Sequence, residues 1–370
     1  IDSCGPASNN INIDFYKKLG FNSIPSRGPL SALTVPGAVA GWKLAYDFSV
    51  KNLGGKIPIS RLLFDAEQAA KEGIAVTKTL RNNLKSKLNQ LVEVVGFKDI
   101  YLKNGKIPNV GDRLIIPKLS NTFSLLIKNG LQDFYSGDVF RKIISDLDIL
   151  GSPLNSDDFK NYKATFVDPL ELKIKDAKLF NLPPPTQGLA SILILGLLDE
   201  LSITCKNNVE LIHNIVEITK AVFKIRDKHI SDPRYMSFHV SEFLTKDFIK
   251  KLAKEINFEK AAPWPTSSLG GDTVWLGATD THGNTVSFIQ SIYWEFGSGL
   301  VLPNTGITMQ NRGVSFSLDL KNHNHLLPGR KPFHTIQPAL AHFDDGRVMS
   351  YGTMGGEGQP QTQATIFYRY

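Results

Sequence analysis

The spacing of apolar positions changes once along the chain, near residue 270. Before that point apolar residues recur every three or four positions, as in helices with one buried face. After it, apolar and polar residues alternate, as in strands with one buried face. Helices followed by strands predict an α+β domain rather than alternating strand-helix-strand units. The predicted helices are Ile59 to Glu72, Asn121 to Asn129, Val139 to Leu150, Leu189 to Leu201 and Val209 to His229.

Two hairpins are predicted in the strand-rich part. Strands 274–279 and 285–292 flank a turn at 280–284, where Gly283 and Asn284 can adopt positive φ angles. A second turn at 344–346 separates strands 338–343 and 347–351. The last residues, 368–370, also read as a strand.

Composition excludes several classes of protein. The 370 residues are 42% hydrophobic and 21% charged, which is ordinary for a globular chain. The net charge of +7 is spread thinly, and no basic block is interleaved with aromatic residues, so we expect no nucleic-acid partner. The longest apolar run, 189–198, is much shorter than the roughly 20 residues that span a bilayer, so we expect no membrane segment.

The cysteines and histidines give no clear metal site. Cys4 and Cys205 lie far apart, which favours free thiols in a reducing compartment such as the cytoplasm, although a bridge remains open. His323, His325 and His334 lack the tight ligand spacing of a zinc site. We therefore expect neither a metal nor a cofactor, with a metal-dependent hydrolase as an alternative.

The candidate chemistry centres on Thr273, where Gly270 and Gly271 run into the first predicted strand. A threonine that opens a strand is usually structural, because β-branched residues favour strands. If the bond between Asp272 and Thr273 is cut, however, the threonine gains a free amine that can act as base for its own hydroxyl.

Two further groups have both a functional and a structural interpretation. The glycine cluster at 353–358 follows a strand, and its backbone amides could stabilise an oxyanion; a plain turn is the alternative. Asn311 and Arg312 offer a fork suited to a carboxylate, whereas a solvent-exposed arginine is the commoner outcome.

Several motifs, in this order, resemble those of the gamma-glutamyltransferases, and they span nearly the whole chain. They combine glycine- and proline-rich stretches with the candidate nucleophile. They are Thr34-Val35-Pro36-Gly37-Ala38-Val39-Ala40-Gly41-Trp42, Pro183-Pro184-Pro185-Thr186-Gln187-Gly188, Asp272-Thr273 with His282-Gly283-Asn284, Phe296-Gly297-Ser298-Gly299, and Met354-Gly355-Gly356.

The resemblance implies an N-terminal-nucleophile hydrolase fold, an αββα sandwich of two stacked sheets between helical layers. It implies a precursor that cuts itself between Asp272 and Thr273. Residues 1–272 would form a large helix-rich fragment and 273–370 a small strand-rich one, incomplete at its C-terminus, the two associating in one domain. Thr273 would be the nucleophile, Gly355 and Gly356 the oxyanion-hole amides, and Ser291 the counterpart of a second threonine whose hydroxyl contacts the nucleophile's amine.

The chain departs from the family pattern where the family reads its glutamyl substrate. Val274-Trp275 replaces threonine and histidine after the nucleophile, which makes the pocket more apolar. The best register places Cys4 at the arginine that holds the substrate carboxylate, and a thiol cannot make that bidentate contact. Elsewhere His334-Thr335 stands for paired serines, Tyr293 for asparagine, Arg312 for glutamine, and Ser315 for an acidic residue.

We therefore expect a gamma-glutamyltransferase-like, autoprocessing N-terminal-threonine amidase that hydrolyses or transfers an acyl group of the γ-glutamyl type through an acyl-enzyme. Its substrate would be a small amide or peptide, and because the residues that read the glutamyl group differ, we expect weak activity at best on γ-glutamyl compounds themselves. Substrate contacts are expected from Asn311, Arg312, His334, Thr335 and Tyr293. An amidase resembling the cephalosporin acylases, or a non-catalytic relative that binds a small metabolite, is the alternative; only a catalytic chain would be found split.

Overall fold

The computed structural model describes residues 1–203, 207–264 and 272–370. They form two compact units. The first contains Ile1–Phe166, Trp294–Leu320 and His325–Lys331, and the second contains Val167–Tyr293, Lys321–Asn324 and Pro332–Tyr370. Each predicted fragment contributes to both units, and the prediction of one domain stays a prediction. The thiol of Cys205 and the glycines at 270–271 lie outside the described residues.

The first unit is mainly helical. The helix predicted at 59–72 is confirmed as α3 with the same bounds, and it packs against α6. Val139, Ile143 and Leu147 of α8, with Phe159 of α9, are fully buried in the main core of this unit. Its elements are α1 (Ile13–Lys18), α2 (Ala38–Asn52), α3 (Ile59–Glu72), β1 (Ile74–Ala75), α4 (Lys78–Leu91), α5 (Phe97–Tyr101), β2 (Arg113–Leu114), α6 (Pro117–Asn129), α7 (Asp133–Ser136), α8 (Asp138–Leu150) and α9 (Ser156–Lys160).

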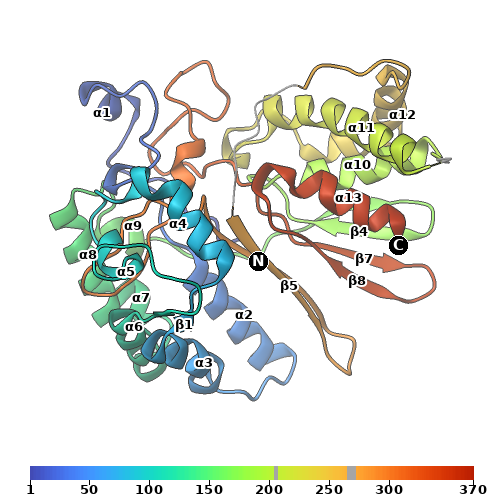
Figure 1. Cartoon of the computed structure of the whole chain (residues 1–370). Coiled ribbons are helices and arrows are strands. Elements are labelled where there is room, and N and C mark those ends of the chain that lie inside the picture. Colours follow the sequence, from blue (N-terminus) through green and yellow to red (C-terminus); the bar gives the residue numbers. More distant parts are fainter. Residues whose placement is uncertain (204–206, 265–271) are drawn as a thin grey trace. The chain divides into compact units, whose positions relative to one another are not determined.

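The second unit contains an antiparallel sheet in the order β3-β4-β7-β8 and a separate hairpin of β5 and β6. Helices α10, α11 and α13 lie over one face of β4, β7 and β8 (Figure 1). Both predicted hairpins are confirmed, and the α+β class with them. The elements are β3 (Leu170–Lys173), β4 (Ala177–Asn181), α10 (Gly188–Glu200), α11 (Asn208–His229), α12 (Lys246–Glu255), β5 (Asp272–Thr279), β6 (Thr285–Tyr293), β7 (Ala339–Phe343), β8 (Val348–Tyr351) and α13 (Gln359–Arg369).

Helix α10 is the central apolar element of this unit. Every residue from Gly188 to Leu198 is buried, as expected for a helix that is apolar on all sides. Pro183, Pro184 and Pro185 precede it, as the sequence predicts. Within the described residues, no helix combines the length and the apolar character needed to cross a membrane.

Two elements differ from the sequence prediction. The sequence predicts a strand at 368–370, but 368 and 369 end helix α13 and Tyr370 follows it. Ala364 and Phe367 lie three positions apart on this helix, and Phe367 stacks on Phe343 with ring centres 5.9 Å apart. The β3–β4 hairpin lies inside the part predicted as helical, and its strands of four and five residues are too short to interrupt that pattern.

The sheet joins both sides of the predicted cleavage site. Strand β4, which precedes residue 272, pairs with β7, which follows it, over five residue pairs from Ala177↔Phe343 to Asn181↔Ala339. The two predicted fragments therefore share one hydrogen-bonded sheet in the uncut chain.

Candidate active site

Thr273 is the second residue of β5 and lies at an irregularity in the β5–β6 ladder. Asp272 pairs with Tyr293 and Val274 pairs with Gln290, so Thr273 alone faces Ser291 and Ile292. Such a bulge bends the strand and redirects side chains, and bulges are common beside active sites. The Thr273 side chain is half-buried.

The hairpin brings together two of the predicted catalytic residues. The Thr273 hydroxyl donates to Ser291 Oγ at 3.1 Å, and the same Oγ accepts from the Tyr293 amide at 2.9 Å. Because the strand end fixes the Ser291 hydroxyl, it can orient the threonine hydroxyl. In the uncut chain the Thr273 nitrogen is a peptide amide with no available lone pair, so only cleavage provides a base on the residue itself.

Tyr293 ends β6 in an unusual backbone conformation. Its φ is 80°, and its side chain is buried with 4% exposed. A bulky residue at positive φ is rare and costs on the order of 1–3 kcal/mol. Since Tyr293 pairs with Asp272, this strained residue lies opposite the predicted cleavage site, a feature that no sequence pattern predicts.

The hairpin also contacts the strand that leads to the glycine cluster. Ser350 of β8 donates to the Val286 carbonyl of β6 at 3.0 Å. A Cβ added at Gly352 would lie 2.1 Å from Cδ1 of Trp275, so the indole packs directly on this glycine. Trp275 follows Thr273 by two residues, and Gly352 precedes Gly355 by three. These contacts hold the segment from Gly352 to Gly355 beside β5, the strand that contains Thr273.

Gly355 and Gly356 have φ angles of 112° and 53°, which side chains rarely adopt. They lead through a 3₁₀ turn, Gly356–Gly358, into α13. Within the described part of the chain, the amide of neither glycine donates a hydrogen bond. Two unengaged amides before a helix N-terminus suit a developing negative charge; the oxyanion role itself stays a prediction.

The predicted substrate residues His334 and Thr335 are buried, with 7% and 1% exposed. The backbone of His334 brackets the proline motif: its amide donates to the Pro185 carbonyl at 2.8 Å, and its carbonyl accepts from the Gln187 amide at 3.0 Å. Two further side chains contact this region: Gln187, which belongs to the proline motif but has no predicted role, and Arg226, which lies outside the motifs. No local sequence pattern indicates Arg226, because its burial and its contacts depend on residues distant in the chain.

Asn311 and Arg312 belong to the other unit. Asn311 is fully buried, donating to the Ser26 carbonyl at 3.0 Å and accepting from the Trp294 amide at 3.2 Å. Arg312 is 2% exposed, so the alternative of a solvent-exposed arginine is wrong. Their role in substrate binding stays a prediction.

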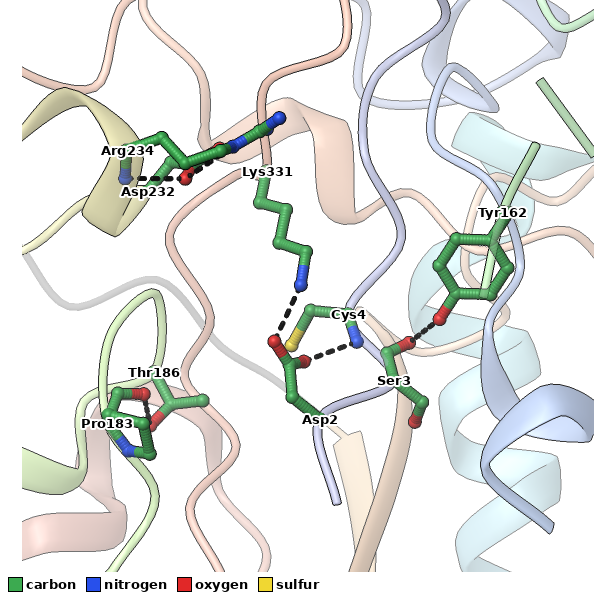
Figure 2. Close-up of polar contacts among 9 residues, drawn as sticks. All are labelled: Asp2, Ser3, Cys4, Tyr162, Pro183, Thr186, Asp232, Arg234 and Lys331. Atoms are coloured by element: carbon green, nitrogen blue, oxygen red, sulfur yellow. Dashed lines mark hydrogen bonds and ion pairs between the residues drawn. The ribbon is translucent and has the colours of Figure 1, made fainter. Parts of the chain in front are cut away.

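Cys4, for which the resemblance predicts the register of the family arginine, lies in a compact polar cluster of the first unit. Figure 2 shows Asp2 accepting from the Cys4 amide at 2.7 Å and from Lys331 at 2.6 Å. Nearby, the Tyr162 hydroxyl donates to the Ser3 carbonyl at 2.7 Å. Burial raises the pKa of the Cys4 thiol well above its ordinary value, and the Asp2 carboxylate adds to the shift. Cys4 is therefore a neutral thiol that cannot replace a guanidinium.

A cavity of about 330 Å³ lies between β5 and β8 in the second unit. Thr273 does not line it, so the cavity does not hold the candidate nucleophile. Its lining residues are Trp275, Gly277, Ala278, Thr279, Val348, Met349, Ser350 and Tyr370.

The metal alternative finds no support in the geometry. No group of three or more His, Cys, Asp or Glu side chains among residues 1–203, 207–264 and 272–370 could hold a metal ion. His323 Nε2 instead lies 3.1 Å from the Ile230 carbonyl, in hydrogen-bond contact with backbone.

The likeness to solved structures defines the class of protein. The chain superimposes on a cephalosporin acylase from Bacillus halodurans with a TM-score of 0.90 and 30% identity, covering 100% of this chain and 68% of that one. This confirms the predicted N-terminal-nucleophile hydrolase fold.

The chain belongs to the gamma-glutamyltranspeptidase family, whose model matches residues 1–370. It is 44% identical over 370 residues to an oxamate amidohydrolase proenzyme of Klebsiella pneumoniae, covering 100% of this chain and 70% of that protein. It is 35% identical over 367 residues to a glutathione hydrolase-like proenzyme of Bacillus subtilis, covering 99% and 68%. The chain is an autoprocessing amidase or acyl-transfer hydrolase of this family.

Replacing Ser291 with alanine should slow self-cleavage about 10- to 100-fold, because the Thr273 hydroxyl loses the acceptor that orients it. Ser291→Thr keeps a hydroxyl and should cleave within about threefold of the wild-type rate. The rate at which fragments appear on a denaturing gel measures both. Ser287→Ala is the matched control, since Ser287 accepts from Trp275 Nε1 at 3.0 Å on the same strand. Equal cleavage rates in Ser291→Ala and wild type would remove Ser291 from the site.

Proposed function

We propose that this protein is an N-terminal-threonine amidohydrolase that cleaves a small carboxylate-bearing amide, with oxamate as its first candidate substrate. The observation that carries the proposal is the hydrogen bond from Thr273 to Ser291 at the β5–β6 bulge, one residue after the predicted cut. This hydrogen bond orients the hydroxyl of Thr273, the residue on which the cut would create a free amine.

Maturation and turnover would use the same hydroxyl. In maturation, Thr273 Oγ attacks the Asp272 carbonyl carbon, the peptide nitrogen leaves as an amine, and water hydrolyses the resulting ester. In turnover, that amine takes the hydroxyl proton as Oγ attacks the substrate carbonyl. The amides of Gly355 and Gly356 would stabilise the oxyanion, ammonia would leave with the transferred proton, and water would release the acid.

Two observations support a small substrate without a glutamyl group. The Klebsiella relative, 44% identical over the whole chain, is named for oxamate. By its resemblance to the family, this chain carries other residues where the family reads the glutamyl group, including Cys4 in the register of an arginine. Oxamate lacks a glutamyl amine and side chain, so it does not require those contacts. Its hydrolysis would yield ammonia and oxalate.

We expect the purified enzyme to release ammonia from oxamate, measured by a coupled glutamate dehydrogenase assay, and the oxalate to appear in equal amount. A γ-glutamyl anilide should react far more slowly, because the residues that grip the glutamyl amine and carboxylate are replaced. Rapid γ-glutamyl transfer with no ammonia from oxamate would contradict the proposed substrate.

The second candidate is an acylase acting on a larger amide, which the TM-score of 0.90 to the Bacillus halodurans acylase favours. The apolar Val274 and Trp275 beside the nucleophile fit a bulkier acyl group. Glutaryl p-nitroanilide separates the two candidates, since release of nitroaniline without ammonia from oxamate would favour the acylase.

After the cut, we propose that the fragments stay together. The five-pair ladder between β4 and β7 joins them without crossing the cleavage site, and α10 packs between elements of both fragments in the core of the second unit. No covalent link is needed to retain this sheet.

A further inference from the structure

A buried arginine on α11 holds the loop that carries Gly355 and Gly356. Arg226 is 3% exposed, and its Nη1 lies 2.8 Å from Glu357 Oε2 and 2.9 Å from Gln187 Oε1. Gln187, fully buried, extends the contact, because its Nε2 donates to the Gly356 carbonyl at 2.9 Å. Arg226 thus reaches the loop by two routes, an ion pair and a relay through one side-chain amide.

The guanidinium of Arg226 is fixed on its other sides as well. Its Nε and Nη2 lie 2.7 and 2.6 Å from Asp227 Oδ1. The ring centre of Phe223 lies 3.6 Å from the guanidinium carbon, and that of Phe333 lies 5.6 Å away. Two carboxylates offset the cost of burying the charge, and the aromatic faces stabilise the cation. The side chain therefore forms a rigid support.

The glycine loop needs such a support. Glycine has access to more backbone conformations than any other residue, so two glycines in succession hold a direction poorly by themselves. Fixing the Gly356 carbonyl and the Glu357 side chain restricts the backbone immediately after the second amide. Donors that are oriented in advance stabilise an oxyanion without reorganising during the reaction.

We propose that Arg226, acting through Gln187 and Glu357, is a positioning residue for the oxyanion amides of Gly355 and Gly356. The inference rests on the proposed function, in that these amides bind the oxyanion of acyl transfer. Gln187 Nε2 also donates to the Thr335 carbonyl at 2.5 Å, so the same relay fixes the chain at a predicted substrate residue.

The test is a pair of variants in the mature enzyme. Arg226→Lys keeps the charge but replaces the planar fork with a single nitrogen, which cannot hold both Gln187 and Glu357 in the same geometry. We expect kcat for oxamate to fall about 10- to 100-fold while KM changes less than about threefold, because the support acts on the transition state. Glu357→Gln removes the ion pair from the loop side and should lower kcat in the same way.

The double variant should be no slower than the slower of the two single variants, because both substitutions break the same contact between Arg226 and Glu357. Arg347→Lys is the matched control. Arg347 pairs with Asp345 at 2.7 Å in the exposed β7–β8 turn, and its substitution should leave kcat unchanged.

An Arg226→Lys enzyme that matures, melts at a lower temperature and keeps the wild-type kcat would overturn the inference and leave Arg226 purely structural. If that variant fails to fold, Glu357→Gln decides alone, because the Glu357 side chain is 21% exposed and its amide is nearly isosteric. A wild-type kcat in Glu357→Gln would then overturn the inference.

A separate measurement tests the role of Arg226 if oxamate proves not to be a substrate. If wild-type enzyme releases no ammonia from oxamate, the positioning role is measured by the rate at which a fluorophosphonate ester labels Thr273. In that reaction Oγ bonds to phosphorus, fluoride leaves, the hydroxyl proton passes to the amine, and the phosphoryl oxygen gains negative charge. Labelling at least tenfold slower in Arg226→Lys supports the inference, whereas equal labelling overturns it.

Discussion

A Thr273→Ala protein should remain a single uncut chain and hydrolyse no amide. Alanine removes the hydroxyl that would attack the Asp272 carbonyl, and without a cut no amine forms to serve as base. Loss of a nucleophile lowers kcat of a hydrolase on the order of 10⁶-fold, below the limit of most assays. Intact mass reports the missing cut, and ammonia release from oxamate reports the missing turnover.

Thr279→Ala is the control for this substitution. Thr279 ends the same strand, and its hydroxyl lies 3.0 Å from that of Thr285, so it loses the same kind of contact at an exposed site. We expect it to mature and to turn over as the wild type does. A Thr273→Ala chain that still splits after Asp272 would remove Thr273 as the nucleophile.

The second large effect is expected from Gly355→Ala. An alanine Cβ meets no described atom within 4 Å, so space is not the obstacle. The obstacle is the backbone, because a φ of 112° strains any L side chain by on the order of 1–3 kcal/mol. The loop should shift to relieve that strain and misplace its amides, with a fall in kcat of about 10²- to 10³-fold.

Gly346→Ala separates this catalytic effect from simple strain. Gly346 has a φ of 90° in the β7–β8 turn, also with no described atom within 4 Å of an added Cβ. Both variants should unfold at a lower temperature, measured by calorimetry. Only Gly355→Ala should lose kcat, and equal kcat in the two variants would show that the glycine loop is not the oxyanion site.

The sequence predicts those helices and strands that are determined by their own residues. The apolar residues of 59–72 keep a helical period, which predicts helix α3 with its observed bounds. The β5–β6 hairpin is predictable because Gly283 can adopt a positive φ in its turn, and the observed φ is 84°. The family motifs then pointed to Thr273 and Ser291, and the structure joins their hydroxyls.

Features that depend on contacts between residues far apart in the sequence could not be predicted. The short stretch with Tyr368 and Tyr370 is typical of a strand, but Phe367 makes its tertiary ring contacts as part of a helix. The support of the glycine loop by Arg226 joins residues 39 and 131 positions away along the chain, and no local pattern encodes such a contact. The burial of Arg312 likewise depends on surroundings that a motif does not describe.

The first residue of the smaller fragment shows whether the chain cuts itself between Asp272 and Thr273. We predict that the purified protein gives two co-purifying fragments, and that N-terminal sequencing of the smaller one begins Thr273, Val274, Trp275. Intact mass should place the end of the other fragment at Asp272. A single uncut chain that hydrolyses an amide, or a fragment that begins at any other residue, would contradict the account.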